Sequence, residues 1–255
     1  MTPQTAKTSL GLPQGIRACL FDLDGVLTQT AKVHCAAWKE IFDEFLEADA
    51  ARRGIRFTPF DPVADYDQYV DGKPRRDGVR SFLASRGIVL PEGAAEDPST
   101  ALTVVGLGRK KNDLLLKRIE QGGVEAYQGS VRFVHAAREA GLPCAVVSSS
   151  ANCQSVLAAV GIEQLFQARI DGNTIIRDHL PGKPAPDTFL AGARALDVAP
   201  DQAAVFEDAI AGVQAGRAGG FGWVIGVDRA GQAAALLENG ADQVVTDLAE
   251  LLEQQ

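Results

Sequence analysis

The sequence predicts an α/β fold: a doubly wound, Rossmann-like parallel-sheet core with a helical module inserted after the first strand. Short apolar runs of strand length end abruptly in polar residues. Amphipathic helical stretches separate several of these runs, which favours a parallel sheet with right-handed crossovers. The segment 32–122 departs from this alternation. In such a sheet, ligands bind at the carboxyl ends of the strands.

Four strands of the core are expected from these patterns. They are residues 16–21, 144–147, 203–206 and 223–227, and each is followed by polar residues that begin with Asp22, Ser148, Glu207 and Asp228. Helical patterns cover 130–140, which a glycine ends, and 185–196, which a proline and an aspartate open. A closing helix is expected over 247–255.

The inserted segment has a different organisation. It contains helical patterns over 32–47, 79–86 and 111–120, with a Pro-, Asp- and Gly-rich section over 57–78. We therefore expect three parts in the chain. They are a flexible N-terminus (1–15), an α/β core (16–31 and 123–255) and a helical module (32–122).

Composition limits the class of protein. Of 255 residues, 46% are hydrophobic and 23% are charged, which is typical of a globular protein. The net charge of −8 argues against nucleic-acid binding through a basic face, and no apolar run approaches the roughly 20 residues of a membrane helix. The N-terminus lacks the apolar region of a signal peptide, and the four cysteines form no CxxC pair. We expect a cytoplasmic protein without nucleic-acid or membrane partners.

The segment Asp22-Leu23-Asp24-Gly25 carries the strongest chemical signal. Two carboxylates just past a buried strand would be costly without a cation or a reactive partner. One carboxylate can act as a nucleophile on phosphorus, and the other as a general acid and base. Gly25 lets the backbone turn and offer an N–H group to a phosphate. Taken alone, the motif could equally cap a turn.

Three other strand ends or loops supply matching groups. Ser148 could bind a phosphate oxygen, although a lone serine there usually caps a turn. Lys183 lies in a loop bounded by prolines, where a lysine is otherwise a surface charge. Glu207 and Asp208 provide the oxygen ligands that Mg²⁺ prefers. Together with the first motif, these are the groups that phosphoryl transfer requires.

These four motifs, in this order, resemble those of the haloacid dehalogenase-like superfamily of phosphotransferases over nearly the whole chain. The resemblance implies that Asp22 is the nucleophile and Asp24 the general acid and base. It implies that Mg²⁺ is held by the Asp22 carboxylate, the Asp24 carbonyl and Asp208, with Glu207 contributing directly or through water. Ser148 and Lys183 would bind the transferred phosphoryl group. The inserted module corresponds to the family's helical cap, which closes over the site and excludes water.

Within the superfamily, the sequence is most similar to the β-phosphoglucomutases. The resemblance implies that Thr30 is a hinge residue and that Arg75, in a loop with Gly72, binds the phosphate that is not being transferred. Lys111 and His34 would act as a pair near the general acid and base. The phosphate- and sugar-binding loop would contain Ser148, Ser149, Ser150 and Asn152.

Several alternatives remain open at these positions. His34 could be an ordinary helix histidine, and Arg75 or its neighbour Arg76 could be solvated. Any of Arg109, Lys110 and Lys111 could face the site. The sequence also departs from the pattern, because Gly78, Ala151 and Ala209 stand where relatives often carry serine, lysine and serine. These departures weaken any inference about the exact sugar.

The resemblance predicts a Mg²⁺-dependent mutase that interconverts β-glucose 1-phosphate and glucose 6-phosphate through an aspartyl-phosphate and a bisphosphate. The first alternative is a phosphatase acting on small sugar phosphates with the same residues. The second is a binding or scaffold protein without activity. A dinucleotide-binding protein is excluded, because no GxGxxG follows the first strand. The expected partners are the sugar phosphate and its bisphosphate. The oligomeric state stays open, and a monomer is compatible with the sequence.

Overall fold

The structure, a computed structural model, describes residues 10–122 and 124–252. The chain divides into two compact units, residues 1–29 with 124–255 and residues 30–123. We call them the core unit and the helical unit. The sequence predicts boundaries after residues 31 and 122, and the contacts place them after residues 29 and 123.

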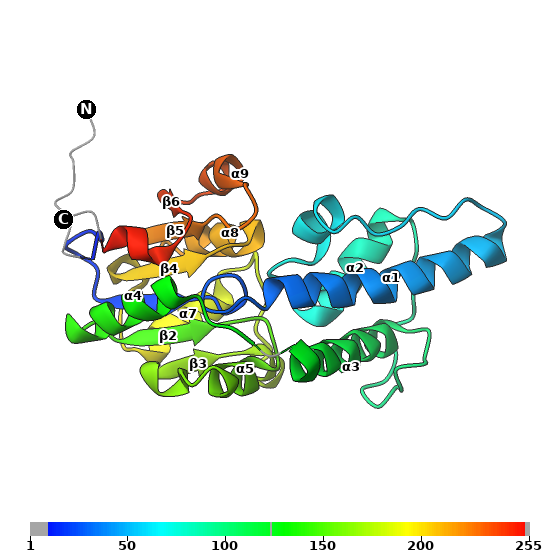
Figure 1. Cartoon of the computed structure of the whole chain (residues 1–255), viewed down its shortest axis with the longest axis horizontal. Helices are drawn as coiled ribbons and strands as arrows, with labels where there is room; N and C mark the ends of the chain where they lie inside the picture. Colours follow the sequence, from blue (N-terminus) through cyan, green and yellow to red (C-terminus); the bar gives the residue numbers. More distant parts are fainter. Residues whose placement is uncertain (1–9, 123, 253–255) are drawn as a thin grey trace. The chain divides into compact units, whose positions relative to one another are not determined.

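The described part of the core unit contains one parallel sheet with strand order β3-β2-β1-β4-β5-β6 (Figure 1). The strands are β1 (Ala18–Phe21), β2 (Cys144–Val147), β3 (Ala168–Ile170), β4 (Ala203–Glu207), β5 (Trp223–Val227) and β6 (Gln243–Val245). The order reverses between β1 and β4, where ligands bind in folds of this type. The predicted doubly wound parallel sheet is confirmed.

Alternating residues of β1 face opposite layers of helices. Leu20 belongs to a buried cluster with Phe189 of α7 (Asp187–Ala195) and Val213 of α8 (Ile210–Ala218). On the other face, the Phe21 ring contacts Phe133 of α4 (Gln128–Glu139), with 6.2 Å between ring centroids. Because both faces of β1 are packed against helices, the strand is firmly placed, and so is the aspartate that follows it.

The sequence analysis did not identify two edge strands, three short helices and the nine-residue α8. β3 and β6 have three residues each and are partly exposed, so they lack the long apolar run of a buried strand. The helices α5 (Cys153–Ala159), α6 (Gly172–Arg177) and α9 (Ala233–Glu238) span two turns or fewer. Such elements are too short to show helical periodicity.

Both ends of the chain differ from the prediction. Instead of a helix over 247–255, a single 3₁₀ turn covers Leu248–Leu251, because Asp247 and Glu250 form a capping box around that one turn. Residues 253–255 lie outside the described residues. The N-terminus was expected to be flexible up to residue 15, but Leu10 and Leu12 are buried. Residues 1–9 lie outside the described part.

The helical unit contains longer helices than the sequence predicts. They are α1 (Ala31–Arg53), a π-helical turn η1 (Tyr66–Val70), α2 (Arg75–Ser85) and α3 (Val104–Gly122). α1 continues past residue 47 and ends at Gly54, whose φ of 64° is left-handed. The stacked rings of Trp38, Phe42 and Phe60 lie in the hydrophobic core of the helical unit. No helix in the described ranges of either unit is long and apolar enough to cross a membrane.

Candidate active site

Lys183 joins the carboxyl ends of three strands of the core unit. Its Nζ atom lies 2.5 Å from Oδ1 of Asp22, which follows β1, and donates to the Val147 carbonyl at the end of β2 over 3.2 Å. It also forms an ion pair with Glu207, the last residue of β4. All three charged side chains are less than a tenth exposed. The structure thus brings together groups that lie up to 185 positions apart in the sequence.

The charges in this group do not balance, because two buried carboxylates share one ammonium group. Burial raises the pKa of Asp22, although Lys183 opposes the shift. Burial also raises the pKa of Glu207 to about 7. Burial alone would lower the pKa of Lys183, but Asp22 and Glu207 outweigh it and raise that pKa above its ordinary value. The excess negative charge suits a cation.

Asp208 lies directly against the turn that carries the first motif. Gly25 has a φ of 90°, and a Cβ atom placed on it would be 1.7 Å from Oδ2 of Asp208. A side chain at position 25 is therefore excluded by both conformation and space. The backbone of Asp24 also hydrogen-bonds to Asp22 within this turn. Gly25 thus allows the second acidic motif to approach the first.

The residues present fit a magnesium ion in their donor chemistry. Mg²⁺ is usually bound through one or two carboxylates together with waters and substrate phosphates. Asp22 and Asp208 offer such carboxylates at adjoining loops, and the close approach of Asp208 to Gly25 places them in one region. Across 10–122 and 124–252, no three His, Cys, Asp or Glu side chains form a ready cluster for a metal. The ion would thus depend on backbone, water or phosphate oxygens as well.

Glu207 is arranged mainly as a counterion. Its Oε1 atom accepts from Lys183, and its Oε2 atom accepts from the Ala209 backbone over 2.9 Å. A Cβ atom on Gly212 would lie 1.9 Å from Oε1, so the carboxylate packs closely against α8. Each carboxylate oxygen keeps a further lone pair, so these bonds are compatible with contact to a metal either directly or through water, as the resemblance implies.

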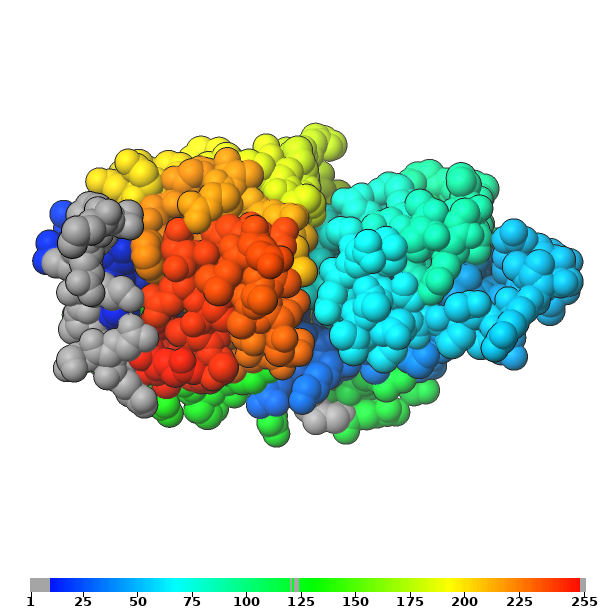
Figure 2. All heavy atoms as spheres, turned by 90° about the horizontal axis from the view of Figure 1, so that it is seen from above, coloured from blue at the N-terminus to red at the C-terminus, as the bar shows by residue number. Residues whose placement is uncertain are grey.

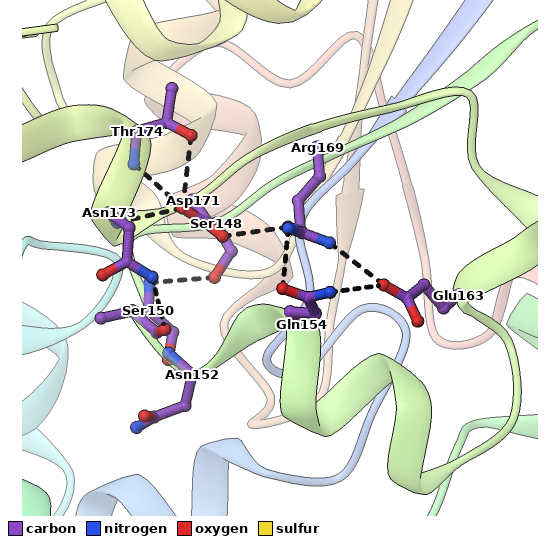
Figure 3. A network of polar contacts seen from close by, with 10 residues as sticks. Ser148, Ser150, Asn152, Gln154, Glu163, Arg169, Asp171, Asn173 and Thr174 are labelled. Carbon is purple, nitrogen blue, oxygen red and sulfur yellow. Dashed lines mark hydrogen bonds and ion pairs between the residues drawn. The ribbon is translucent and has the colours of Figure 1, made fainter. Parts of the chain in front are cut away.

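The loop that begins at Ser148 is held by the neighbouring β3 and α6 (Figure 3). Ser148 is 2% exposed, and its Oγ atom accepts from the Ser150 backbone over 3.1 Å. The Ser150 carbonyl in turn accepts from Gly172, and the Ala151 carbonyl accepts from Nδ2 of Asn173. Ser150 Oγ accepts from the Asn152 backbone. The loop is thus held by hydrogen bonds within itself and to α6.

An outer layer of polar residues supports this loop. Asp171 caps α6 by accepting from the backbones of Asn173 and Thr174, each over 3.0 Å. Arg169 bonds to Asp171 over 3.0 Å and also reaches Glu163. Figure 3 shows these contacts as one continuous network with Ser148. The sequence analysis missed all of these supporting residues.

A second polar cluster lies within the helical unit. Nζ of the buried Lys111 is 3.1 Å from Nδ1 of His34 and 4.9 Å from the centre of the Trp38 ring. Burial lowers the pKa of His34 well below its usual value, and Lys111 and Arg75 lower it further. A neutral imidazole can accept a hydrogen bond from the ammonium group. We call His34, Arg75, Lys111 and Asn112 the helical-unit cluster.

Arg75 belongs to this cluster from the first turn of α2. Its Nη2 atom donates to Oδ1 of Asn112 over 2.8 Å, and Gly72 turns the preceding loop with a φ of 69°. Arg76, in contrast, lies 4.0 Å from Glu92 and is about half exposed. Thr30 is buried at the start of α1.

The three consecutive cations of α3 have separate partners. Arg109 donates to the Ala95 carbonyl, Lys110 pairs with Glu44, and Lys111 contacts His34. Of these three cations, Lys111 is therefore the one that contacts His34 within the helical unit.

The fold and the core site define a haloacid dehalogenase-like protein. The sequence matches the haloacid dehalogenase-like hydrolase family over residues 16–220, and the chain belongs to this family.

Three known proteins illustrate what the chain is similar to. A β-phosphoglucomutase of Mycobacterium tuberculosis is 56% identical over 253 residues, which cover 98% of this chain and 97% of that protein. A fructose-1-phosphate phosphatase of Escherichia coli is 30% identical over 209 residues, covering 79% and 92%. The crystal structure of a β-phosphoglucomutase from Clostridium difficile matches with a TM-score of 0.70 at 24% identity, covering 92% and 93%. At that identity the structural likeness supports the fold alone.

Proposed function

We propose that the protein is a Mg²⁺-dependent β-phosphoglucomutase that interconverts β-glucose 1-phosphate and glucose 6-phosphate. The observation that carries the reaction type is the buried Asp22 carboxylate, 2.5 Å from Lys183 at the carboxyl end of β1. The substrate is supported by the 56% identity, along almost the whole chain, to a protein of that name.

Asp22 acts as the nucleophile in the first half-reaction and as the leaving group in the second. Its carboxylate attacks phosphorus, the bond from phosphorus to the sugar oxygen breaks, and Asp24 donates a proton to that oxygen. In the reverse half, Asp24 takes the proton of the attacking sugar hydroxyl, and the phosphoryl group leaves Asp22. Glucose 1,6-bisphosphate forms when phosphorylated Asp22 transfers its phosphoryl group to a bound glucose monophosphate. The bisphosphate then reorients in the site and transfers its other phosphoryl group to Asp22.

The other groups of the core site hold charge and position. Lys183 and Ser148 bind oxygens of the transferring phosphoryl group. A magnesium ion held by Asp22, Asp208 and the Asp24 carbonyl would neutralise the phosphate charge and orient it for in-line attack. Glu207 keeps the Lys183 ammonium group in place, because it is the buried partner that remains when Asp22 carries phosphate.

Mutase action requires that water not reach the phosphorylated Asp22 before the second sugar hydroxyl does. We propose that the helical unit is the cap that excludes water. Arg75 binds the phosphate that is not being transferred, because a guanidinium group matches phosphate geometry, with Lys111 and His34 beside it. Thr30 serves as the hinge residue, Gly72 shapes the loop that carries Arg75, and Ser149, Ser150 and Asn152 contact the substrate. The Gly25 N–H group, which the sequence predicts to bind a phosphate, donates instead to the Thr28 carbonyl over 2.8 Å, so the contribution of Gly25 is its turn.

Phosphorus NMR tests this function directly. β-Glucose 1-phosphate is incubated with the protein, Mg²⁺ and a trace of glucose 1,6-bisphosphate. We expect glucose 6-phosphate as the main product. Inorganic phosphate as the main product would reject the mutase and favour the alternative, a sugar-phosphate phosphatase, which the likeness to the Escherichia coli phosphatase supports.

A cytoplasmic location is part of the same proposal. Four free cysteines, three of them buried, support it, since such thiols persist in reducing compartments.

A further inference from the structure

A third loop of the core unit, at the carboxyl end of β5, contacts both acidic motifs. This loop, residues 228–233, is shaped by Asp228, whose carboxylate accepts four backbone N–H groups between residues 230 and 233. Figure 2 shows the segments that follow β5, in orange and red, gathered on one face of the core unit. Because a single carboxylate organises the loop, its side chains start from a fixed backbone.

Arg229 of this loop reaches the turn of the first motif. Its Nε atom donates to the Gly25 carbonyl over 2.9 Å. Nη1 donates to the Thr246 carbonyl over 2.6 Å and lies 3.3 Å from Oδ2 of Asp247. The guanidinium carbon lies 3.6 Å from the centre of the Tyr127 ring. These contacts fix the guanidinium from several sides, so the Gly25 carbonyl meets a firmly held donor.

Gln232, three residues later, reaches the second acidic motif. Its Nε2 atom donates to the Asp208 carbonyl over 3.0 Å. The Asp208 carboxylate, in turn, lies against Gly25. One short loop therefore holds the backbone on both sides of the point where the two motifs meet.

We propose that Arg229 and Gln232 are positioning residues that set the separation of the Asp22–Gly25 turn and Asp208, and thereby tune Mg²⁺ binding. The proposal rests on the proposed metal-dependent function and assigns no direct substrate contact to either residue. Groups that orient metal ligands without touching the metal typically affect affinity or activity by about 10- to 100-fold. A shift of a few tenths of an ångström in the Gly25 backbone would change the separation of the Asp22 and Asp208 carboxylates.

An arginine in the last turn of α8 provides the control. Nε of Arg217 donates to the Gly240 carbonyl over 3.1 Å, and its Nη2 pairs with Asp242 over 2.6 Å. Arg217 thus makes the same kinds of bond as Arg229, a glycine carbonyl and an aspartate, but it contacts neither acidic motif. Because Arg217 is more exposed than Arg229, 54% against 17%, its variant gives a lower limit on the structural effect of losing such an arginine.

The test compares Arg229→Met, Gln232→Met and Arg217→Met with the wild-type chain. Mg²⁺ affinity is measured by calorimetry on the whole protein, and kcat and KM are measured at low and saturating Mg²⁺. We expect Arg229→Met to weaken Mg²⁺ binding by about 10-fold and Gln232→Met by a few-fold. Raising Mg²⁺ should restore most of kcat. Arg217→Met should lower the melting temperature without changing Mg²⁺ affinity.

The outcomes separate this proposal from the function on which it rests. Wild-type Mg²⁺ affinity in both loop variants would overturn the proposal, even if their stability falls as in Arg217→Met. Absence of Mg²⁺ binding by the wild-type protein would overturn it as well. If the wild-type protein releases inorganic phosphate instead of isomerising its substrate, the mutase assignment fails, while the calorimetric comparison still decides the role of the loop. If Arg229→Met does not fold, the Mg²⁺ affinity of Gln232→Met alone tests the proposal.

Discussion

The polar groups of the core site and those of the helical-unit cluster differ in how their charges are compensated. In the core site, the buried Lys183 contacts two carboxylates, Asp22 and Glu207. In the helical-unit cluster, Lys111 contacts a neutral imidazole and an indole ring, and Arg75 contacts the Asn112 amide. The first arrangement holds the proposed nucleophile and suits a metal. The second concentrates positive charge and suits an anion.

The difference shows which side chains can be changed without unfolding the protein. Breaking a buried ion pair leaves an uncompensated charge and is strongly destabilising, whereas exposed pairs contribute little. Substitutions in the core site should therefore affect stability and chemistry together. Those in the helical-unit cluster should affect substrate binding with smaller effects on stability.

The largest expected effect is that of Asp22→Asn. Removing the nucleophile should lower turnover by at least about 10⁴-fold, because no other group can carry the phosphoryl intermediate. The fold should persist, since Lys183 keeps Glu207 as a buried partner. Phosphorus NMR measures turnover and circular dichroism checks folding. A folded Asp22→Asn protein with wild-type turnover would contradict the nucleophile assignment.

Lys183→Met should lower both activity and stability. It leaves Asp22 and Glu207 buried without their cation, which should cost about 3–5 kcal/mol in the free energy of unfolding. The control is Lys110→Met, which removes a surface pair with Glu44 and should cost about 1 kcal/mol or less. Urea unfolding of both variants measures the difference. Equal losses would show that the core site is not the buried ionic group described above.

Arg75→Ala should act mainly on KM. A hydrogen bond to a charged group contributes about 1.5–3 kcal/mol, so the loss of Arg75 should raise KM for the sugar phosphate about 10- to 100-fold. Arg76→Ala is the matched control, because Arg76 is adjacent, half exposed and near Glu92 instead of Asn112. Steady-state kinetics separates KM from kcat. An equal effect of the two variants would remove Arg75 from the proposed phosphate site.

The sequence was sufficient to predict the strands whose residues are almost all buried and apolar. β1, β2, β4 and β5 are buried on both faces, and their apolar runs are recognisable. β3 and β6 lie at the edges of the sheet, where partly exposed residues weaken the pattern. The length of α1 depends on Gly54, and on tertiary packing that no local pattern records.

The same limit applies to the core site. Asp22, Ser148 and Glu207 could be found because each lies at the carboxyl end of a recognisable strand. Asp171 was missed together with β3, although it follows that strand in the same way. Arg229 had a signal, because it comes next to the polar residue that ends β5, but its contact with Gly25 joins residues 204 positions apart. Only the folded chain shows such a contact.

The smallest expected effect concerns pH and tests the helical-unit cluster. Because the pKa of His34 is well below its usual value of about 6.5, the folded protein keeps His34 neutral where the unfolded chain takes up a proton. The unfolded state then binds more protons, so stability should fall as pH decreases below about 6.5. The expected loss is about 1.4 kcal/mol per pH unit at most. NMR titration of the histidine rings, assigned with His34→Gln, measures the pKa itself.

Lys111→Met sharpens this test, since burial and Lys111 both depress the pKa of His34. Removing the ammonium group should move that pKa back toward its ordinary value and reduce the loss of stability at low pH, while His34→Gln should abolish that contribution. If instead the pKa of His34 stays the same in Lys111→Met, the two groups are not coupled, and the cluster is not the compact cationic site that distinguishes the helical unit from the core site.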